Sequence, residues 1–151
     1  MTPSGPDLKI VADRLAIVDA SLQQLRALPT ESLEAFLADA RTLPASESLL
    51  RRSLEALLDV ARHLLAKGFG EGPLEYRQVA RRTAERGLVR DPEVAEVFLR
   101  LAGYRNRLTH FYAEITPEEL FDIVSRRLDD VAAVAGELRQ AAARIAAATS
   151  P

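Results

Sequence analysis

Hydrophobic residues recur three and four positions apart along most of the chain, and sustained alternation of hydrophobic and polar residues does not occur. The three-four spacing places one apolar stripe on a helix, whereas a half-buried strand requires alternation. The first such segment, 7–28, carries its stripe at Leu8, Val11, Leu15, Val18, Leu22 and Leu25. The sequence therefore predicts an all-α fold that begins with a helix over 7–28.

Capping residues, prolines and glycines predict the ends of the next elements. A short second helix is expected within 29–44, stopping at Pro44, and a longer helix from Ser46 to Gly68. The longer helix should be the central, most buried one, because one face carries Leu50, Leu54, Leu57, Ala61, Leu64 and Leu65. The stretch "GFGEGP" that follows is a loop, whose glycines serve either a turn or the close approach of a ligand.

Three more helices are predicted in the second half of the chain. One spans 75–86, and the next begins with Asp91 as its cap and Pro92 at its first position. Thr116 caps a single long last helix, whose apolar stripe falls at positions 120, 124, 128, 131, 135, 138, 142 and 145. These elements predict an up-and-down antiparallel helical bundle with a long C-terminal helix, whose first and last helices pair with each other.

Length and composition favour one soluble domain over 1–151. The chain has 151 residues, of which 48% are hydrophobic and 28% are charged. It has no cysteine, no targeting segment at its start and no apolar run long enough to cross a bilayer. We therefore expect a cytoplasmic protein that does not associate with a membrane.

Charge and motifs limit the kinds of binding site. The formal net charge of -2 gives no general attraction to nucleic acid, so an RNA site would need a local concentration of arginines. Only two of the 20 basic residues are lysines, which suits phosphate binding but also follows from a GC-rich coding sequence. Acidic pairs at 118–119 and 129–130 have no histidine at metal-ligand spacing, so neither a metal nor a cofactor is predicted.

Scarce residue types are concentrated in "GYRNRLTHFY", residues 103–112, at the end of a predicted helix. On an ideal helix Arg105 and Tyr112 share one stripe, and Asn106 and His110 share an adjoining one. Such a face suits RNA cleavage without a metal, because an imidazole moves a proton and a guanidinium stabilises charge on phosphorus. The same side chains would also suit a hydrogen-bonded, half-buried polar patch without catalytic activity.

The order of Arg105, Asn106, His110 and Tyr112 resembles the R-x4-H signature of the HEPN superfamily and, in its His-x-Tyr extension, the HepT branch. The resemblance covers 8–138. It implies a homodimer in which two copies of the motif share one cleft, and an endoribonuclease that needs no metal and uses the ribose 2′-OH as nucleophile. It also implies proton transfer by His110, stabilisation of the phosphorane by Arg105 and positioning by Asn106.

HepT-like proteins are toxins of type VII toxin–antitoxin systems, each partnered by a minimal nucleotidyltransferase. The resemblance implies that this antitoxin adenylylates Tyr112 and so blocks cleavage of the RNA substrate. Two alternatives remain open at the level of sequence: a non-catalytic HEPN-like module or scaffold that binds a nucleotidyltransferase, and a bundle that only oligomerises.

Other polar residues are expected to have structural roles. His63 has no arginine five positions before it, and Asp59 is placed to pair with Arg62 or with an arginine of a neighbouring helix. The sequence does not indicate where the side chains of Arg51, Arg52 and Arg107 point, although a basic RNA-binding cleft would need such residues.

Overall fold

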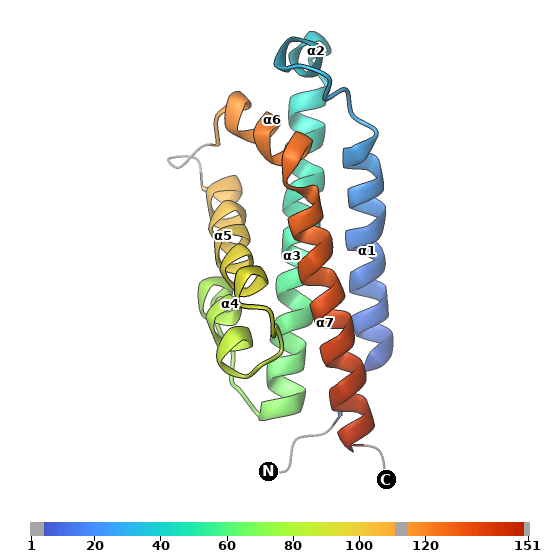
Figure 1. Ribbon diagram of the computed structural model, residues 1–151, viewed down its shortest axis with the longest axis vertical. Coiled ribbons are helices and arrows are strands. Elements are labelled where there is room, and N and C mark those ends of the chain that lie inside the picture. Colours follow the sequence, from blue (N-terminus) through green and yellow to red (C-terminus); the bar gives the residue numbers. More distant parts are fainter. Residues whose placement is uncertain (1–4, 111–114, 150–151) are drawn as a thin grey trace.

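The computed structural model describes residues 5–110 and 115–149, and the regular elements among them are all helices (Figure 1). Four helices lie side by side and alternate in direction along the long axis. These are α1 (Leu8–Arg26), α3 (Thr42–Phe69), α5 (Pro92–Thr109) and α7 (Leu128–Thr149). Three shorter helices join them, namely α2 (Leu33–Ala38), α4 (Tyr76–Glu85) and α6 (Pro117–Arg126). The predicted all-α, up-and-down bundle is confirmed.

α3 is the central helix, and it contacts each of the other six. The predicted stripe is buried throughout, at Leu50, Leu54, Leu57, Ala61, Leu64 and Leu65. Burial of one leucine side chain stabilises a fold by roughly 1.5–3 kcal/mol relative to its exposure. The side chains of α3 that face α4 and α5 are therefore attached to the most firmly packed helix of the bundle.

The two ends of α3 differ from those predicted. The helix already begins at Thr42, and Pro44 lies in its first turn, where a helix has no partner for the missing N–H. At the other end, α3 continues past Gly68 and stops at Gly70, whose φ of 67° is the left-handed conformation that glycine favours. The prediction of Pro44 as a stop was wrong, because proline is tolerated at this position of a helix.

The predicted single last helix is divided at Arg127, where the backbone leaves the helical region with φ -118° and ψ 8°. α6 crosses the end of the bundle (Figure 1), and there the ring of Phe121 lies 5.5 Å from that of Phe36. Arg127 spans the break with ion pairs to Asp122 at 3.5 Å and Asp130 at 3.9 Å. The prediction of one continuous helix was wrong because the apolar spacing continues across a tertiary turn that neither proline nor glycine marks.

α1 packs against both α3 and α7, which confirms the predicted pairing of the first and last helices. The start of α1 is tied to α3 by the backbone N–H of Asp7, which donates to Nε2 of His63 at 2.9 Å. Burial, with a smaller effect of the Lys67 charge, lowers the pKa of His63 and so favours the neutral imidazole that accepts this bond. His63 therefore has the structural role that the sequence predicts.

Among the helices that the structure describes, none combines the length and the apolar character that crossing a membrane requires.

Candidate active site

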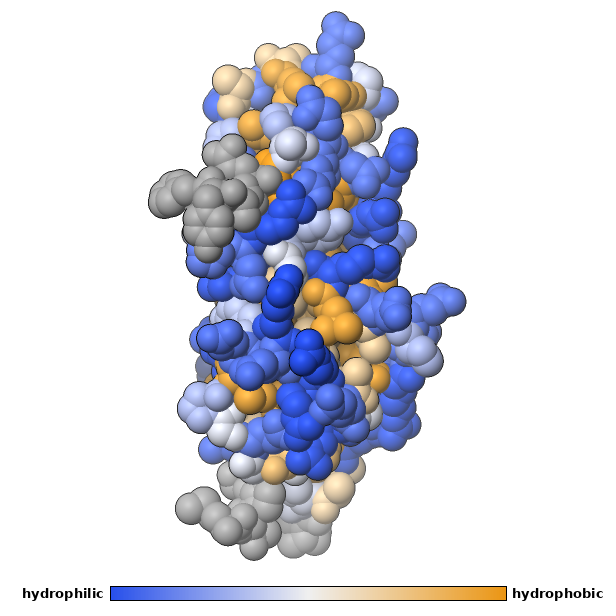
Figure 2. All heavy atoms as spheres, turned by 90° about the vertical axis from the view of Figure 1, so that its left-hand side faces the viewer, coloured by the Kyte–Doolittle hydropathy of each residue, from blue (hydrophilic) through white to orange (hydrophobic). Residues whose placement is uncertain are grey.

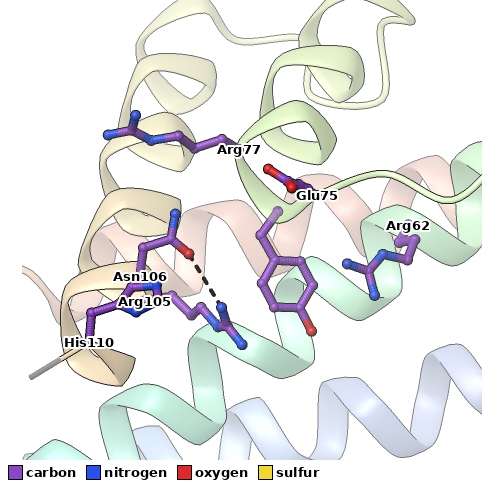
Figure 3. Close-up of a pocket in the computed structure, with 7 residues that line it drawn as sticks. Arg62, Glu75, Arg77, Arg105, Asn106 and His110 are labelled. Atoms are coloured by element: carbon purple, nitrogen blue, oxygen red, sulfur yellow. Dashed lines mark hydrogen bonds between the residues drawn. The ribbon is translucent and has the colours of Figure 1, made fainter.

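A cavity of about 490 Å³ opens where α3, the start of α4 and the end of α5 meet (Figure 3). The face that carries α4 and α5 is mainly hydrophilic, with small apolar patches between the polar side chains (Figure 2). The residues that line the cavity are Arg62, Glu75, Tyr76, Arg77, Arg105, Asn106 and His110. Three of the four residues that the sequence singles out thus share one polar cavity, and the fourth, Tyr112, lies outside the described residues.

The motif is positioned by the end of α5 rather than by a continuous helical face. The hydroxyl of Thr109 donates to the carbonyl oxygens of Arg105 and Asn106, at 3.3 and 3.0 Å, in the last turn of the helix. His110 then adopts an extended backbone, with φ -114° and ψ 119°, and its side chain is exposed. The ideal-helix placement of His110 was therefore wrong, because the helix ends one residue earlier, yet His110 still borders the same cavity as Arg105.

Arg105 is held by neighbours from three elements. Its Nε lies 3.5 Å from a carboxylate oxygen of Glu55, and its Nη1 donates to Oδ1 of Asn106 at 3.3 Å. The guanidinium carbon lies 4.5 Å from the centre of the Tyr76 ring, in a cation–π contact. The side chain is 26% exposed and points into the cavity (Figure 3), so a stacked and oriented guanidinium meets any anion that enters.

Tyr76, at the start of α4, is the residue on which this arrangement depends. Its hydroxyl donates to Oδ1 of Asp59 at 2.7 Å, and Arg62 also stacks over its ring, 4.4 Å from the centre. Asp59 is 3.8 Å from Arg62, so the predicted pair of the two is confirmed, although the contact of Asp59 with Tyr76 is much shorter. Sequence reasoning missed Tyr76 and Arg62, because both are more than 25 positions before the motif and no local spacing connects them.

The arginines whose directions the sequence leaves open do not line this cavity. Arg51 lies 3.6 Å from Glu55, and Arg52 is exposed. Both terminal nitrogens of Arg107 donate to the carboxylate of Glu119 at 2.7 Å, and the side chain borders a second cavity, of about 450 Å³, on another side of His110. The local positive charge instead comes from Arg62, Arg77 and Arg105, and sequence signals did not single out the first two.

Comparison with known proteins identifies the family of the chain. A family model described as "Ribonuclease HepT-like" matches residues 18–138. The chain belongs to the HepT-like ribonuclease family. This membership confirms both the resemblance stated from the motif and the predicted endoribonuclease activity.

Individual relatives of this HepT-like chain agree with the family. A tRNA nuclease HepT from Aphanizomenon flos-aquae is 28% identical over 116 residues, which are 77% of this chain and 78% of that protein. A tri-AMPylated Shewanella oneidensis HEPN toxin, solved in complex with its MNT antitoxin, has a TM-score of 0.76 at 19% identity, over 87% of this chain and 97% of that one. A toxin–antitoxin structure with AMP-PNP has the same TM-score at 18% identity, over 87% and 98%. The solved structures show a shared fold.

The groups in the HepT-like cavity suit a phosphodiester. An exposed imidazole can transfer a proton to or from a reacting oxygen, and a guanidinium can stabilise the charge that develops on phosphorus. The carboxamide of Asn106 hydrogen-bonds Arg105 and is placed to orient either that side chain or a phosphate. Within residues 5–110 and 115–149, no three histidine or acidic side chains lie close enough together to hold a metal ion.

The Tyr76 hydroxyl gives the HepT-like fold a measurable dependence on alkaline pH. Burial, with Asp59 as acceptor, raises the pKa of Tyr76 from 10 to about 12, although Arg62 and Arg105 oppose the shift. The unfolded chain loses this proton near pH 10, so the contribution of the neutral phenol to stability is complete below about pH 10 and disappears as the pH rises toward about 12.

Urea unfolding of the parent and of Tyr76→Phe, at about pH 9 and about pH 11, tests this dependence. We expect the parent to lose more of its free energy of unfolding between the two pH values, because Tyr76→Phe has no phenol to ionise at this position. Equal losses in the two proteins would contradict the half-buried hydrogen bond from Tyr76 to Asp59.

Proposed function

We propose that this chain is the RNA-cleaving toxin of a type VII toxin–antitoxin pair, and that a nucleotidyltransferase antitoxin silences it by adenylylating Tyr112. The observation that carries the proposal is the shared cavity of Arg105, Asn106 and His110, at the end of a helix in a HepT-like bundle. Support for the antitoxin comes from the structural neighbours, which include a HEPN toxin in complex with MNT antitoxin.

The proposed reaction is a transesterification within the RNA strand. The ribose 2′-oxygen forms a bond to the adjacent phosphorus, the bond from phosphorus to the 5′-oxygen breaks, and a 2′,3′-cyclic phosphate and a 5′-hydroxyl remain. One proton leaves the 2′-hydroxyl and one reaches the 5′-oxygen, and His110 performs one of these transfers. Arg105 stabilises the negative charge of the phosphorane, and Asn106 positions Arg105 or the phosphate.

A homodimer would bring two copies of this site together. The exposed side chain of His110, which borders the cavity, leaves room for a second copy of the chain to complete the cleft. We take tRNA as the first substrate to test, because the curated relative from Aphanizomenon flos-aquae is a tRNA nuclease. Substrate would reach a local group of three arginines, even though the whole chain carries a net charge of -2.

Adenylylation of Tyr112 would block the site through both bulk and charge. The tyrosine follows His110 by two positions in the sequence, and His110 directly follows α5. An adenylyl group adds a phosphate with negative charge, which competes with RNA phosphate for Arg105 and repels the incoming strand. Modification and cleavage would therefore exclude each other without any change of fold.

Cleavage by the purified chain, before and after treatment with its antitoxin, tests the proposal. Unmodified protein, verified by intact mass, is expected to cleave labelled tRNA in EDTA. After incubation with a purified minimal nucleotidyltransferase antitoxin, ATP and Mg²⁺, the parent is expected to gain the mass of one or more AMP groups and to lose cleavage. Tyr112→Phe should keep cleaving, because it offers no phenol at this position.

Tyr104→Phe is the matched control for this experiment, because Tyr104 lies on α5 one residue before Arg105. This variant should be modified and silenced like the parent. If verified, unmodified parent cleaves neither tRNA nor mRNA, the non-catalytic binding module replaces the toxin as the better account. If Tyr112→Phe is silenced as fully as the parent, the acceptor is a different residue.

A further inference from the structure

We propose that Arg62 binds a second phosphate of the RNA strand, next to the scissile phosphate at Arg105, and that Tyr76 sets the distance between the two guanidinium groups. This inference rests on the proposed function, since it assigns a further substrate contact to the same cavity. Neither Arg62 nor Tyr76 belongs to the motif that identifies the family.

The two guanidinium groups approach one ring from different elements. The guanidinium carbon of Arg62 on α3 lies 4.4 Å from the centre of the Tyr76 ring, and that of Arg105 on α5 lies 4.5 Å from it. Arg62 and Arg105 stand on opposite sides of the pocket in Figure 3. The two cations are therefore no farther apart than the sum of these distances, so one flexible RNA strand can place two of its phosphates against them.

A hydrogen bond fixes the Tyr76 ring, which both guanidinium groups contact. The hydroxyl of Tyr76 is bonded to Asp59 on α3, one turn before Arg62 on the same helix. Tyr76 and Arg62 are thus held relative to each other by a single buried helix and one short hydrogen bond. A spacing fixed before the RNA arrives lowers the entropy cost of binding two phosphates at once.

Arg62 has donors left for an anion. Its Nη2 donates to the carbonyl oxygen of Leu74 at 2.9 Å, which fixes the direction of the side chain. Asp59 is 3.8 Å from Nη1, too far for a hydrogen bond, so Nη1 is the donor that remains for an anion. Nε is buried and is not available to a ligand. Arg107 provides the contrast, because Glu119 binds both of its terminal nitrogens.

The charge of the cavity favours an anionic ligand such as a phosphate over a neutral ligand. Arg77 is exposed and lines the same opening, and within the described part of the chain no carboxylate forms an ion pair with it. Glu75 is the one acidic residue of the lining. In the lining itself three guanidinium groups meet one carboxylate, and Asp59 and Glu55 outside the lining offset part of the charge of Arg62 and Arg105. The opening of the cavity therefore presents more positive than negative groups to a polyanionic strand.

Cleavage of short oligoribonucleotides with and without one flanking phosphate tests the inference. The substrates share one scissile bond and differ by a terminal phosphate at the 5′ or the 3′ side. For the parent we expect the phosphate on one of the two sides to raise kcat/KM by about tenfold, the effect of one charge-assisted hydrogen bond. For Arg62→Gln we expect this ratio to fall to about one, because its amide carries no charge.

The ratio is insensitive to loss of folded protein, because partial unfolding of Arg62→Gln lowers both rates equally. Arg14→Gln is the matched control, since Arg14 is an exposed arginine on α1, away from the cavity, and should keep the ratio of the parent. An unchanged ratio in Arg62→Gln, or a parent that gains from neither phosphate, overturns the inference.

The role of Tyr76 has its own readout in the same assay. Tyr76→Leu removes the ring that both guanidinium groups contact and should lower the ratio toward one. Tyr76→Phe keeps the ring but loses the hydrogen bond to Asp59, so its ratio should lie between those of Tyr76→Leu and the parent. A ratio that stays at the parental value in Tyr76→Leu would remove Tyr76 from the proposal.

Failure of the proposed function is distinguishable from failure of this inference. If the parent cleaves no RNA, equilibrium binding of the same oligoribonucleotides replaces the rate measurement. A gain in affinity from the flanking phosphate that Arg62→Gln loses and Arg14→Gln keeps would still support the phosphate contact. A gain that Arg62→Gln retains would overturn it.

Discussion

Replacement of His110 by alanine is expected to lower the rate constant for RNA cleavage by about 10²–10⁴-fold, the range of general acid–base catalysis. The side chain is exposed at the end of α5 and borders the cavity, so its loss removes the proposed proton-transfer group without opening a hole in the core. Single-turnover cleavage of labelled tRNA in EDTA, with enzyme in excess, measures this effect separately from product release.

The other histidine of the chain is the control for this experiment. His63→Ala loses the hydrogen bond from the backbone N–H of Asp7, at the start of α1, and should lose a little stability while cleaving RNA like the parent. Residual cleavage by His110→Ala within a few-fold of the parent, with Tyr112 unmodified in both, would show that another group transfers the proton. Equal losses in the two variants would point to the fold instead of the chemistry.

The helical bundle follows from sequence because its stripes are local and continuous. Leu50, Leu57 and Leu64 of α3 are all buried, as the three-four spacing predicts. The ends of helices were harder to predict wherever tertiary contacts decide them. The break at Arg127 places Phe121 against Phe36, which lies 85 positions earlier, and no residue beside the break signals it.

The residues of the candidate site also fall into those that the sequence identifies and those that only the structure reveals. Arg105, Asn106 and His110 lie within six positions, so a motif could identify them before their geometry was known. Arg62 and Tyr76 enter the cavity from α3 and from the start of α4, and only the packing of these helices against α5 brings them to Arg105. Composition gave one indication, because tyrosine is scarce in this chain and Tyr76 lies three positions after the end of the glycine-rich stretch.

Arg105→Gln is expected to lower kcat by about 10²–10³-fold, the usual effect of removing one donor to a developing oxyanion. Arg105→Lys should recover only a small part of this loss. A lysine keeps the charge but has no planar fork, and it cannot reproduce both the stacking on Tyr76 and the hydrogen bond to Asn106. Separate values of kcat and KM with tRNA distinguish the two contributions, because an interaction made only in the transition state changes kcat.

Arg107→Gln is the matched control, two positions farther along α5. Both terminal nitrogens of Arg107 are bound to Glu119, so this variant should lose no more than about 1 kcal/mol of stability, the value of a partly exposed ion pair. Its cleavage rate should stay near that of the parent, since its guanidinium does not border the cavity of Arg105. If Arg107→Gln loses as much activity as Arg105→Gln, the phosphate lies toward the second cavity beside His110, and the assignment of Arg105 to the phosphorane is wrong.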